Sequence, residues 1–280
     1  MRAELRCAFL ALAIACSGLA IRPALAEPGD AGLCENGTDS AVVIAACTPI
    51  IEAGGTRELS LALALDDRCS ARNDLGKFDL ALQDCNAALR LNGDFARTYD
   101  NRGNAYAGKE QYELAIRDYD SAIRRDPHFD YAYYNRGLAY EALGNYAQAI
   151  KDYTAAIRVN PNDTYDYLAR CYGYALVGEA ALAISDCDKS LELNPVDASI
   201  VLDGRGYAHL RAGDLDRAIA DYNAADAAGA PRAATRRAGR ICRQSASAGS
   251  RDVRAPRFAC FLVSRQIRSG AIMIPVRNSG

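Results

Sequence analysis

Small and apolar side chains recur at helical spacing through the middle of the chain, and the whole pattern repeats after 34 residues. Residues 96–129 and 130–163 show it most clearly, because each contains Asn-Arg-Gly, Tyr-x-x-Ala-Ile, Asp-Tyr, Ala-Ile-Arg and a closing proline. The same frame covers 62–95, 164–197 and, after a slip of one residue, 199–232. A polar turn divides each unit, so we expect five tandem helical hairpins.

The two clearest units resemble the tetratricopeptide repeat. Small residues stand where that family has them, tyrosines occupy its bulky positions, and a proline closes each unit. The matching residues are Gly103, Tyr106, Tyr112, Ala115, Tyr119, Ala122 and Pro127, and again Gly137, Tyr140, Tyr146, Ala149, Tyr153, Ala156 and Pro161. The resemblance covers 62–232, although the family's tryptophan is absent throughout. It implies an all-α, right-handed superhelical solenoid of tandem helix-turn-helix hairpins that binds other proteins.

A partial unit is expected ahead of the five repeats. Residues 33–53 resemble the second half of a repeat, with Cys47 and Ile50 at two of its core positions. The first unit of a solenoid must cover an apolar edge that would otherwise stay open. We therefore predict that residues 27–61 form an N-terminal cap.

Residues 1–26 have the pattern of a secretory signal peptide. Arg2 and Arg6 precede an apolar run, and Ala24 and Ala26 are the small residues that a signal peptidase recognises. The pattern predicts cleavage after Ala26, no transmembrane segment in the mature chain, and a periplasmic or secreted protein. The alternative is a lipoprotein anchored through Cys16.

Loss of that segment leaves eight cysteines in four neighbouring couples. They are Cys34 and Cys47, Cys69 and Cys85, Cys171 and Cys187, and Cys242 and Cys260. No couple has the C-x-x-C spacing of a zinc or redox site. In the repeat frame the second and third couples replace a glycine and a tyrosine that should face each other inside one hairpin. We predict disulfides in an oxidising compartment, with free buried cysteines as the alternative.

One arginine and one aspartate, sixteen residues apart, recur in all five units. The pairs are Arg68 and Asp84, Arg102 and Asp118, Arg136 and Asp152, Arg170 and Asp186, and Arg205 and Asp221. We expect a repeated structural ion pair, either between the two helices of a hairpin or between successive hairpins. A solvated charged edge is the alternative.

Charge is distributed unevenly along the chain. Residues 27–231 carry 19 basic and 33 acidic side chains, which argues against a nucleic-acid partner for this body. Residues 232–280 carry 11 arginines and one acidic residue. We expect 233–280 to be an Arg-rich and mostly disordered tail. Either the tail is attracted to an anionic lipid or polymer, or its reading frame is in question.

Residues that could carry catalysis are few. The sequence contains no phosphate-binding, zinc-protease or serine-hydrolase motif, and it has only two histidines. His209 stands at a core position that three sibling units fill with tyrosine, and His128 lies in a turn between units. We expect no catalytic residue, no metal and no cofactor, and therefore not an enzyme.

In the tetratricopeptide repeat family the first helix of each hairpin lines a concave groove. The positions carried over to this chain are Arg97, Asp100, Asn104, Tyr131, Tyr134, Leu138, Glu141, Tyr165, Leu168, Tyr172, Asp203 and Tyr207. The resemblance implies a tyrosine-rich groove with acidic spots that suits a peptide with apolar and basic side chains. Packing between neighbouring hairpins is the alternative role of these tyrosines.

The function implied is that of an exported scaffold for protein–protein interaction. Two other functions are compatible with the same residues: an envelope lipoprotein or assembly factor, and a noncatalytic regulatory subunit of an envelope enzyme. Neither the identity of a protein or peptide partner nor the oligomeric state follows from the sequence.

Overall fold

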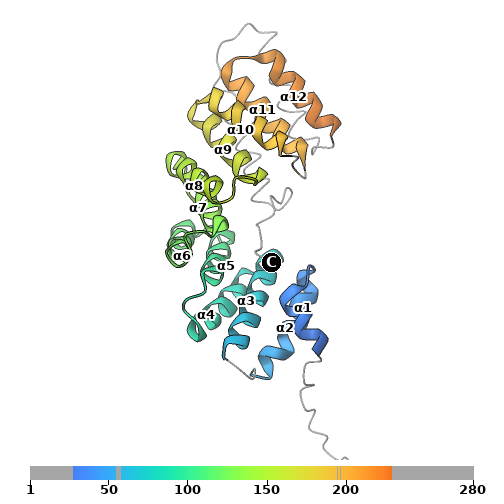
Figure 1. Ribbon diagram of the computed structural model, residues 1–280, viewed down its shortest axis with the longest axis vertical. Coiled ribbons are helices and arrows are strands. Elements are labelled where there is room, and N and C mark those ends of the chain that lie inside the picture. The colour runs from blue at the N-terminus through green and yellow to red at the C-terminus, as the bar shows by residue number, and fades with distance from the viewer. Residues whose placement is uncertain (1–27, 55–57, 194, 196, 229–280) are drawn as a thin grey trace, which may run out of the picture.

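The structure is a computed structural model, which describes residues 28–54, 58–193, 195 and 197–228. Over these residues the chain forms twelve α-helices and no strand, and the helices pack in consecutive pairs along an elongated stack (Figure 1). The expected all-α solenoid is thereby confirmed. The helices are α1 (Pro28–Asn36), α2 (Ser40–Glu52), α3 (Glu58–Asp74), α4 (Phe78–Leu91), α5 (Ala96–Gly108), α6 (Tyr112–Arg125), α7 (Asp130–Ala142), α8 (Tyr146–Val159), α9 (Thr164–Val177), α10 (Ala180–Glu192), α11 (Ala198–Ala212) and α12 (Leu215–Ala227).

Tight turns join the two helices of each hairpin. Between α7 and α8 the turn contains Gly144 with a φ of 76°, in the left-handed region where a side chain is strained. Glycine takes the same conformation in three sibling turns, at Gly76, Gly178 and Gly213. Between α5 and α6 the residue is Glu110, with a φ of 59°. These turns reverse the chain and so place the second helix beside the first.

Close packing inside the hairpins depends on very small side chains. Gly103 on α5 lies against the ring of Tyr119 on α6, so that a Cβ on Gly103 would stand 2.6 Å from Tyr119 Cε1. Ala115 and Ala122 are fully buried on the same second helix. The same contact recurs between Gly137 and Tyr153 and between Gly206 and Tyr222. Each pair combines a missing side chain with a large ring, which lets the two helices approach closely.

Disulfides take the place of glycine and tyrosine in two hairpins. Cys69 on α3 is bonded to Cys85 on α4, with their Cα atoms 5.6 Å apart. Cys171 on α9 is bonded to Cys187 on α10 in the same arrangement, at 5.5 Å. All four side chains are completely buried. Each covalent bond therefore fills the core position of a hairpin and also closes the loop between its helices.

A shorter hairpin, α1 and α2, stands at the N-terminal end of the stack, where the repeat pattern predicts part of a unit. A disulfide between Cys34 and Cys47 joins its helices, with Cα atoms 4.9 Å apart. The hairpin packs onto α3, and Ser40 Oγ donates a hydrogen bond to Asp74 Oδ2 at 2.8 Å. It thus covers the side of α3 that faces away from the rest of the solenoid.

Several predicted features lie outside the described residues. They are the signal peptide 1–26 with Cys16, the tail 233–280, and the couple Cys242 and Cys260. Within the described ranges, no helix combines the length and the apolar character needed to cross a bilayer.

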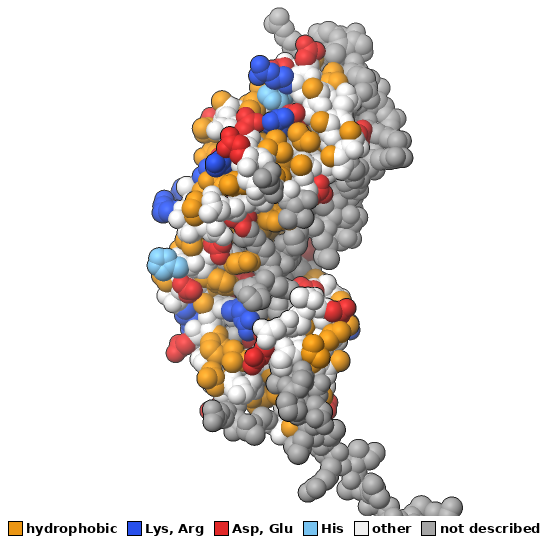
Figure 2. All heavy atoms as spheres, turned by 45° about the vertical axis from the view of Figure 1, so that its right-hand side comes forward, with side chains coloured by type: hydrophobic (Ala, Val, Ile, Leu, Met, Phe, Trp, Pro, Cys, Tyr) orange, Lys and Arg blue, Asp and Glu red, His pale blue; other side chains and the backbone are white. Residues whose placement is uncertain are grey.

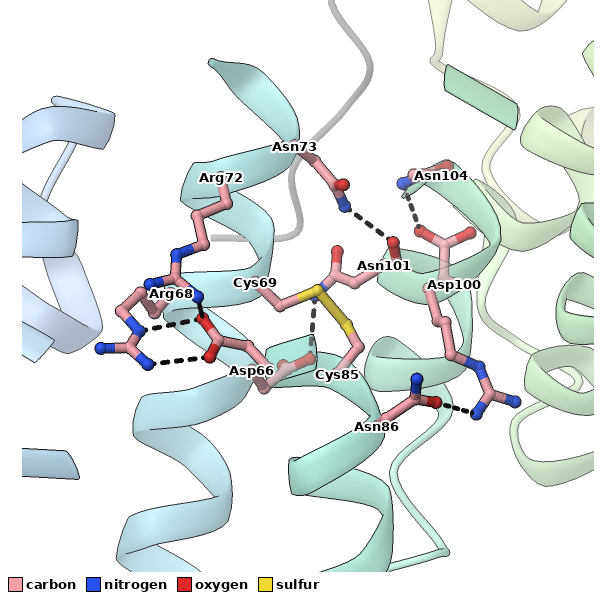
Figure 3. Close-up of a disulfide and its surroundings, with 12 residues drawn as sticks. Asp66, Arg68, Cys69, Arg72, Asn73, Cys85, Asn86, Asp100, Asn101 and Asn104 are labelled. Carbon is pink, nitrogen blue, oxygen red and sulfur yellow. Dashed lines mark hydrogen bonds and ion pairs between the residues drawn. A yellow bond between two sulfur atoms is a disulfide. The ribbon is translucent and has the colours of Figure 1, made fainter. Parts of the chain in front are cut away.

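In each of the five hairpins from α3 to α12, one arginine holds three helices together. Arg68 on α3 donates from Nε and Nη2 to the two carboxylate oxygens of Asp84 on α4, at 2.9 and 2.8 Å (Figure 3). Its Nη1 donates to Thr48 Oγ1 on the preceding helix, α2, at 3.0 Å. The ion pair therefore spans the two helices of one hairpin and, through the third nitrogen, the junction with the previous hairpin.

The same three-way contact repeats at every later junction, and we call the series the arginine ladder. Its members are Arg102 with Asp118 and Asn86, Arg136 with Asp152 and Asp120, Arg170 with Asp186 and Thr154, and Arg205 with Asp221 and Asp188. The aspartates that pair within each hairpin are buried, so these ion pairs are not a solvated edge. Bidentate pairs of this kind are both stronger and more specific in geometry than exposed ones.

Replacing Gly103 by alanine should lower the free energy of unfolding by about 1–3 kcal/mol, because the new methyl group overlaps the buried Tyr119 ring. Gly93→Ala is the matched control, since the nearest atom to its new Cβ would be Leu89 O at 3.7 Å. Urea unfolding followed by circular dichroism measures both variants. Equal stability of the two would contradict this packing.

Candidate functional site

The first helices of the hairpins carry every predicted groove residue. These helices are α3, α5, α7, α9 and α11. In Figure 1, α3 and α5 lie in one layer, and the second helices α4 and α6 lie in another layer beside it. Helix α3 packs against α5, α5 against α7, and α9 against α11. The candidate site is therefore the surface of this layer of first helices.

Some of the predicted groove residues are buried within the layer. They are Asp100, Asn104, Tyr134, Leu168 and Tyr207. The ring of Tyr134 lies 6.0 Å from the ring of Tyr153 on α8. Asn104 Oδ1 accepts a hydrogen bond from Tyr119 Oη at 2.8 Å. The structure therefore places these side chains in the packing between helices, which is the alternative role considered for the tyrosines.

The remaining predicted residues keep part of their surface open. They are Arg97, Tyr131, Leu138, Glu141, Tyr165, Tyr172 and Asp203. Tyr131 on α7 and Tyr165 on α9 occupy the same position in successive units. Tyr172 Oη donates to Ile200 O at 3.3 Å and lies 3.4 Å from Asp203 Oδ2 on α11. The surface that stays available thus combines tyrosines with two carboxylates.

The basic residue of this surface, Arg97, is engaged in an ion pair. Its Nε lies 2.6 Å from Asp66 Oδ2 and its Nη2 lies 2.6 Å from Asp67 Oδ1, both on α3. Burial raises the pKa of Asp67 to about 6, although the guanidinium acts in the opposite direction. Arg97 therefore neutralises neighbouring carboxylates and does not form an open site for an anion.

A row of two buried Asp–Asn hydrogen bonds, which was not predicted from the sequence, joins α3 to α5 and α5 to α7. Asn101 Nδ2 on α5 donates to Asp66 Oδ1 on α3 at 2.9 Å (Figure 3). Asn135 Nδ2 on α7 donates to Asp100 Oδ1 on α5 at 3.0 Å. The signal was present, because an aspartate in one unit and an asparagine 35 residues later recur in the frame.

Burial makes two carboxyl groups of this layer, those of Asp100 and Asp203, weaker acids than usual. It raises the pKa of Asp100 to about 7, although Asn135 and Asn104 donate hydrogen bonds that lower the value. It also raises the pKa of Asp203 to about 6, with Tyr172 acting in the opposite direction. Asp100 and Asp203 therefore keep their protons at a pH where exposed aspartates are already ionised.

No catalytic arrangement emerges among the described residues. His209 is buried on α11, with Nε2 3.8 Å from Asp221 Oδ2, and His128 is exposed. An open pocket of about 280 Å³ beside His209 is lined partly by Arg205 and Asp188, which are bonded to each other in the arginine ladder. Across the described ranges, no group of His, Cys, Asp and Glu is placed to hold a metal ion.

The described part of the face in Figure 2 carries hydrophobic side chains interspersed with charges of both signs. The charges are not gathered into one large patch of a single sign. Recognition on such a surface would depend on the placement of individual side chains more than on a uniform field.

Two family models match the hairpins in the middle of the stack. One, described as "Tetratricopeptide repeat", matches residues 131–163, and the other, described as "TPR repeat", matches residues 103–144. This chain is a tetratricopeptide repeat (TPR) protein. The matched segments contain parts of the second and third TPR hairpins, α5–α6 and α7–α8, in which the family's small and bulky positions are clearest.

Solved TPR structures share the fold of this chain. "YrrB: a TPR protein with an unusual peptide-binding site" is 21% identical, with a TM-score of 0.52 over 65% of this chain and 92% of its own. A thermophilic TPR protein from Thermus thermophilus, TTC0263, is 24% identical, with a TM-score of 0.51 over 66% and 96%. At these identities the similarity concerns the fold alone. No curated protein sequence matches the chain.

The TPR fold should be more stable at about pH 5 than at about pH 8. An aspartate whose pKa rises on folding keeps its proton in the folded state, so the free energy of unfolding falls as pH rises from about 4 to 7 for Asp100. Asp100→Asn should reduce this fall, whereas the exposed Asp126→Asn should retain it. Urea titrations across this range measure the effect. A wild-type stability that increases with pH would contradict it.

Proposed function

We propose that this TPR protein is an exported scaffold that binds a partner polypeptide on the surface formed by its first helices. The TPR fold suggests protein–protein interaction, and the proposal adds which surface is used and where the protein works. The observation that carries it is the run of partly exposed aromatic side chains on α7 and α9. YrrB, which is similar in fold, is described as having a peptide-binding site, and that site is a property of YrrB.

Tyrosines supply the contact area of the proposed surface. Tyr131 and Tyr165 stand one repeat apart on α7 and α9, and Leu138 lies two turns beyond Tyr131. A tyrosine offers a large apolar ring and a hydroxyl while losing few rotamers on binding, which is why tyrosines are frequent at interfaces. One tyrosine per repeat suits a ligand that runs along the stack.

The charge of the surface favours a partner with basic side chains. Glu141 and Asp203 are partly exposed among the tyrosines, and the basic Arg97 is already paired with carboxylates of α3. An incoming lysine or arginine would gain attraction in a partly desolvated setting, whereas an acidic segment would be repelled. We therefore propose a peptide that combines apolar and basic residues.

Export is supported by the signal-like N-terminus together with the disulfide bonds. Three disulfides hold three of the described hairpins, and such bonds persist in oxidising compartments. We propose a periplasmic or secreted protein, cleaved after Ala26 and acting without catalysis. Lipid attachment through Cys16 remains the alternative mode of retention at the envelope.

Peptides selected on the purified protein from a random display library test the surface. We expect the selected peptides to be enriched in Arg or Lys beside Leu or aromatic residues. Tyr131→Ala combined with Tyr165→Ala should weaken their binding by about tenfold or more in fluorescence anisotropy, because both anchors are lost.

Leu114→Ala combined with Leu182→Ala is the matched control, since both leucines are exposed on second helices, α6 and α10. This variant should bind like the wild type. Undiminished binding by a folded tyrosine variant, or enrichment of acidic peptides, would overturn the proposed surface.

A further inference from the structure

Successive first helices are held together by specific polar contacts at most junctions. At α3/α5 and α5/α7 an asparagine donates to a buried aspartate of the preceding helix, at 2.9 and 3.0 Å. At α9/α11 Tyr172 Oη bonds to α11, and the helices pack closely. Each of these contacts fixes the angle between two neighbouring hairpins, in addition to the arginine ladder.

The α7/α9 junction is built differently. Its positions equivalent to the Asp–Asn pair hold Tyr134 on α7 and Ala169 on α9, which cannot form that hydrogen bond. The backbones of α7 and α9 also lie farther apart than those of the other successive first helices, and Tyr134 and Ala169 belong to one buried apolar cluster. Arg170 still joins α9 to α8 through Thr154. This junction therefore lacks the Asp–Asn hydrogen bond of the α3/α5 and α5/α7 junctions, and its two helices are held apart by a large buried ring.

A buried carboxyl group lies at this same junction. Asp166, in the first turn of α9, is completely buried, and neither of its carboxylate oxygens has a hydrogen-bond partner. The four sibling units hold small or apolar residues at this buried position: Ala64, Thr98, Ala132 and Val201. An ionised carboxylate without a partner is costly inside a protein, so the Asp166 side chain stays buried only while it is protonated.

The charged surroundings do not relieve this cost. Asp130 on α7 acts on Asp166 as a like charge, and Arg170 on α9 acts in the opposite direction but is bonded to Asp186. Burial and Asp130 together raise the pKa of Asp166 to about 8. Asp163, at the start of α9, accepts from the Asp166 backbone amide at 3.4 Å and adds no cation.

Carboxylates on the other elements packed against α9 are engaged elsewhere. They are Asp152 on α8 with Arg136, Asp186 on α10 with Arg170, and Asp203 on α11 with Tyr172. Asp130 itself accepts from Asn160 Nδ2 at 3.0 Å. The Asp166 carboxyl group can therefore change its charge at this junction without breaking a bond of the arginine ladder.

We propose that the junction between hairpins α7–α8 and α9–α10 is a proton-controlled hinge, closed while Asp166 is protonated and loosened when it ionises. Ionisation leaves a buried negative charge beside Asp130, and water can reach that charge only if α7 and α9 move apart. The arginine ladder keeps the second helices connected, so the movement changes the curvature of the stack and leaves both hairpins folded. The hinge goes beyond the binding surface proposed above and does not depend on it.

Distance distributions between two spin labels test the hinge. One pair, at Lys151 on α8 and Ser185 on α10, spans the junction, and a control pair, at Arg117 on α6 and Lys151, spans the neighbouring one. All three sites are exposed. The labels are attached through an unnatural amino acid, because the cysteines form disulfides. In the wild type the first distribution should become roughly twofold broader between about pH 6 and about pH 9, while the control stays narrow.

Asp166→Ala introduces the residue that two sibling units carry, and Asp166→Asn keeps the shape without the charge. Both variants should give a narrow distribution at both pH values. The proposal is overturned if the wild type does not broaden, if the variants broaden as much as the wild type, or if the control pair broadens equally. The last result would indicate general unfolding in place of a local hinge.

Discussion

In each of the five repeat hairpins the guanidinium of one arginine joins three helices, and the register of the repeats depends on this contact. In the third TPR hairpin, Arg136 binds both oxygens of Asp152 and reaches Asp120 on the preceding hairpin at 2.5 Å. A helix pair could slide or rotate if only apolar surfaces met, because apolar contacts have little directional preference. The planar fork of arginine fixes both the separation and the orientation of its partners.

The core around this ladder is unusually poor in large aliphatic side chains, and small residues bring the helices close together. Glycine on one helix faces a tyrosine on the other in three hairpins, and a disulfide replaces the pair in two. Polar groups such as Asp66 and Asp100 are consequently buried between first helices, where asparagines satisfy them. Several of the buried carboxyl groups have raised pKa values, which links the stability of the fold to pH.

Much of the hairpin architecture could be predicted from the sequence, because contacts inside a hairpin follow from one repeat frame. The facing of Cys69 and Cys85 and the pairing of Arg68 with Asp84 both depend on helical spacing within one unit. Contacts between hairpins depend in addition on the superhelical twist, which the frame does not specify. For that reason the Asp–Asn row and the unpaired Asp166 were not foreseen, and the burial of Tyr134 was considered only as the alternative to an open groove.

The central claim is that the ladder arginines stabilise the stack through buried, bidentate ion pairs. A double-mutant cycle with Arg136→Ala and Asp152→Ala measures the coupling directly, with the exposed pair Lys189 and Glu192 on α10 as the control. The account predicts a coupling of about 2–3 kcal/mol for the ladder pair and less than about 0.5 kcal/mol for the control. Equal, small coupling energies for the two pairs would contradict it.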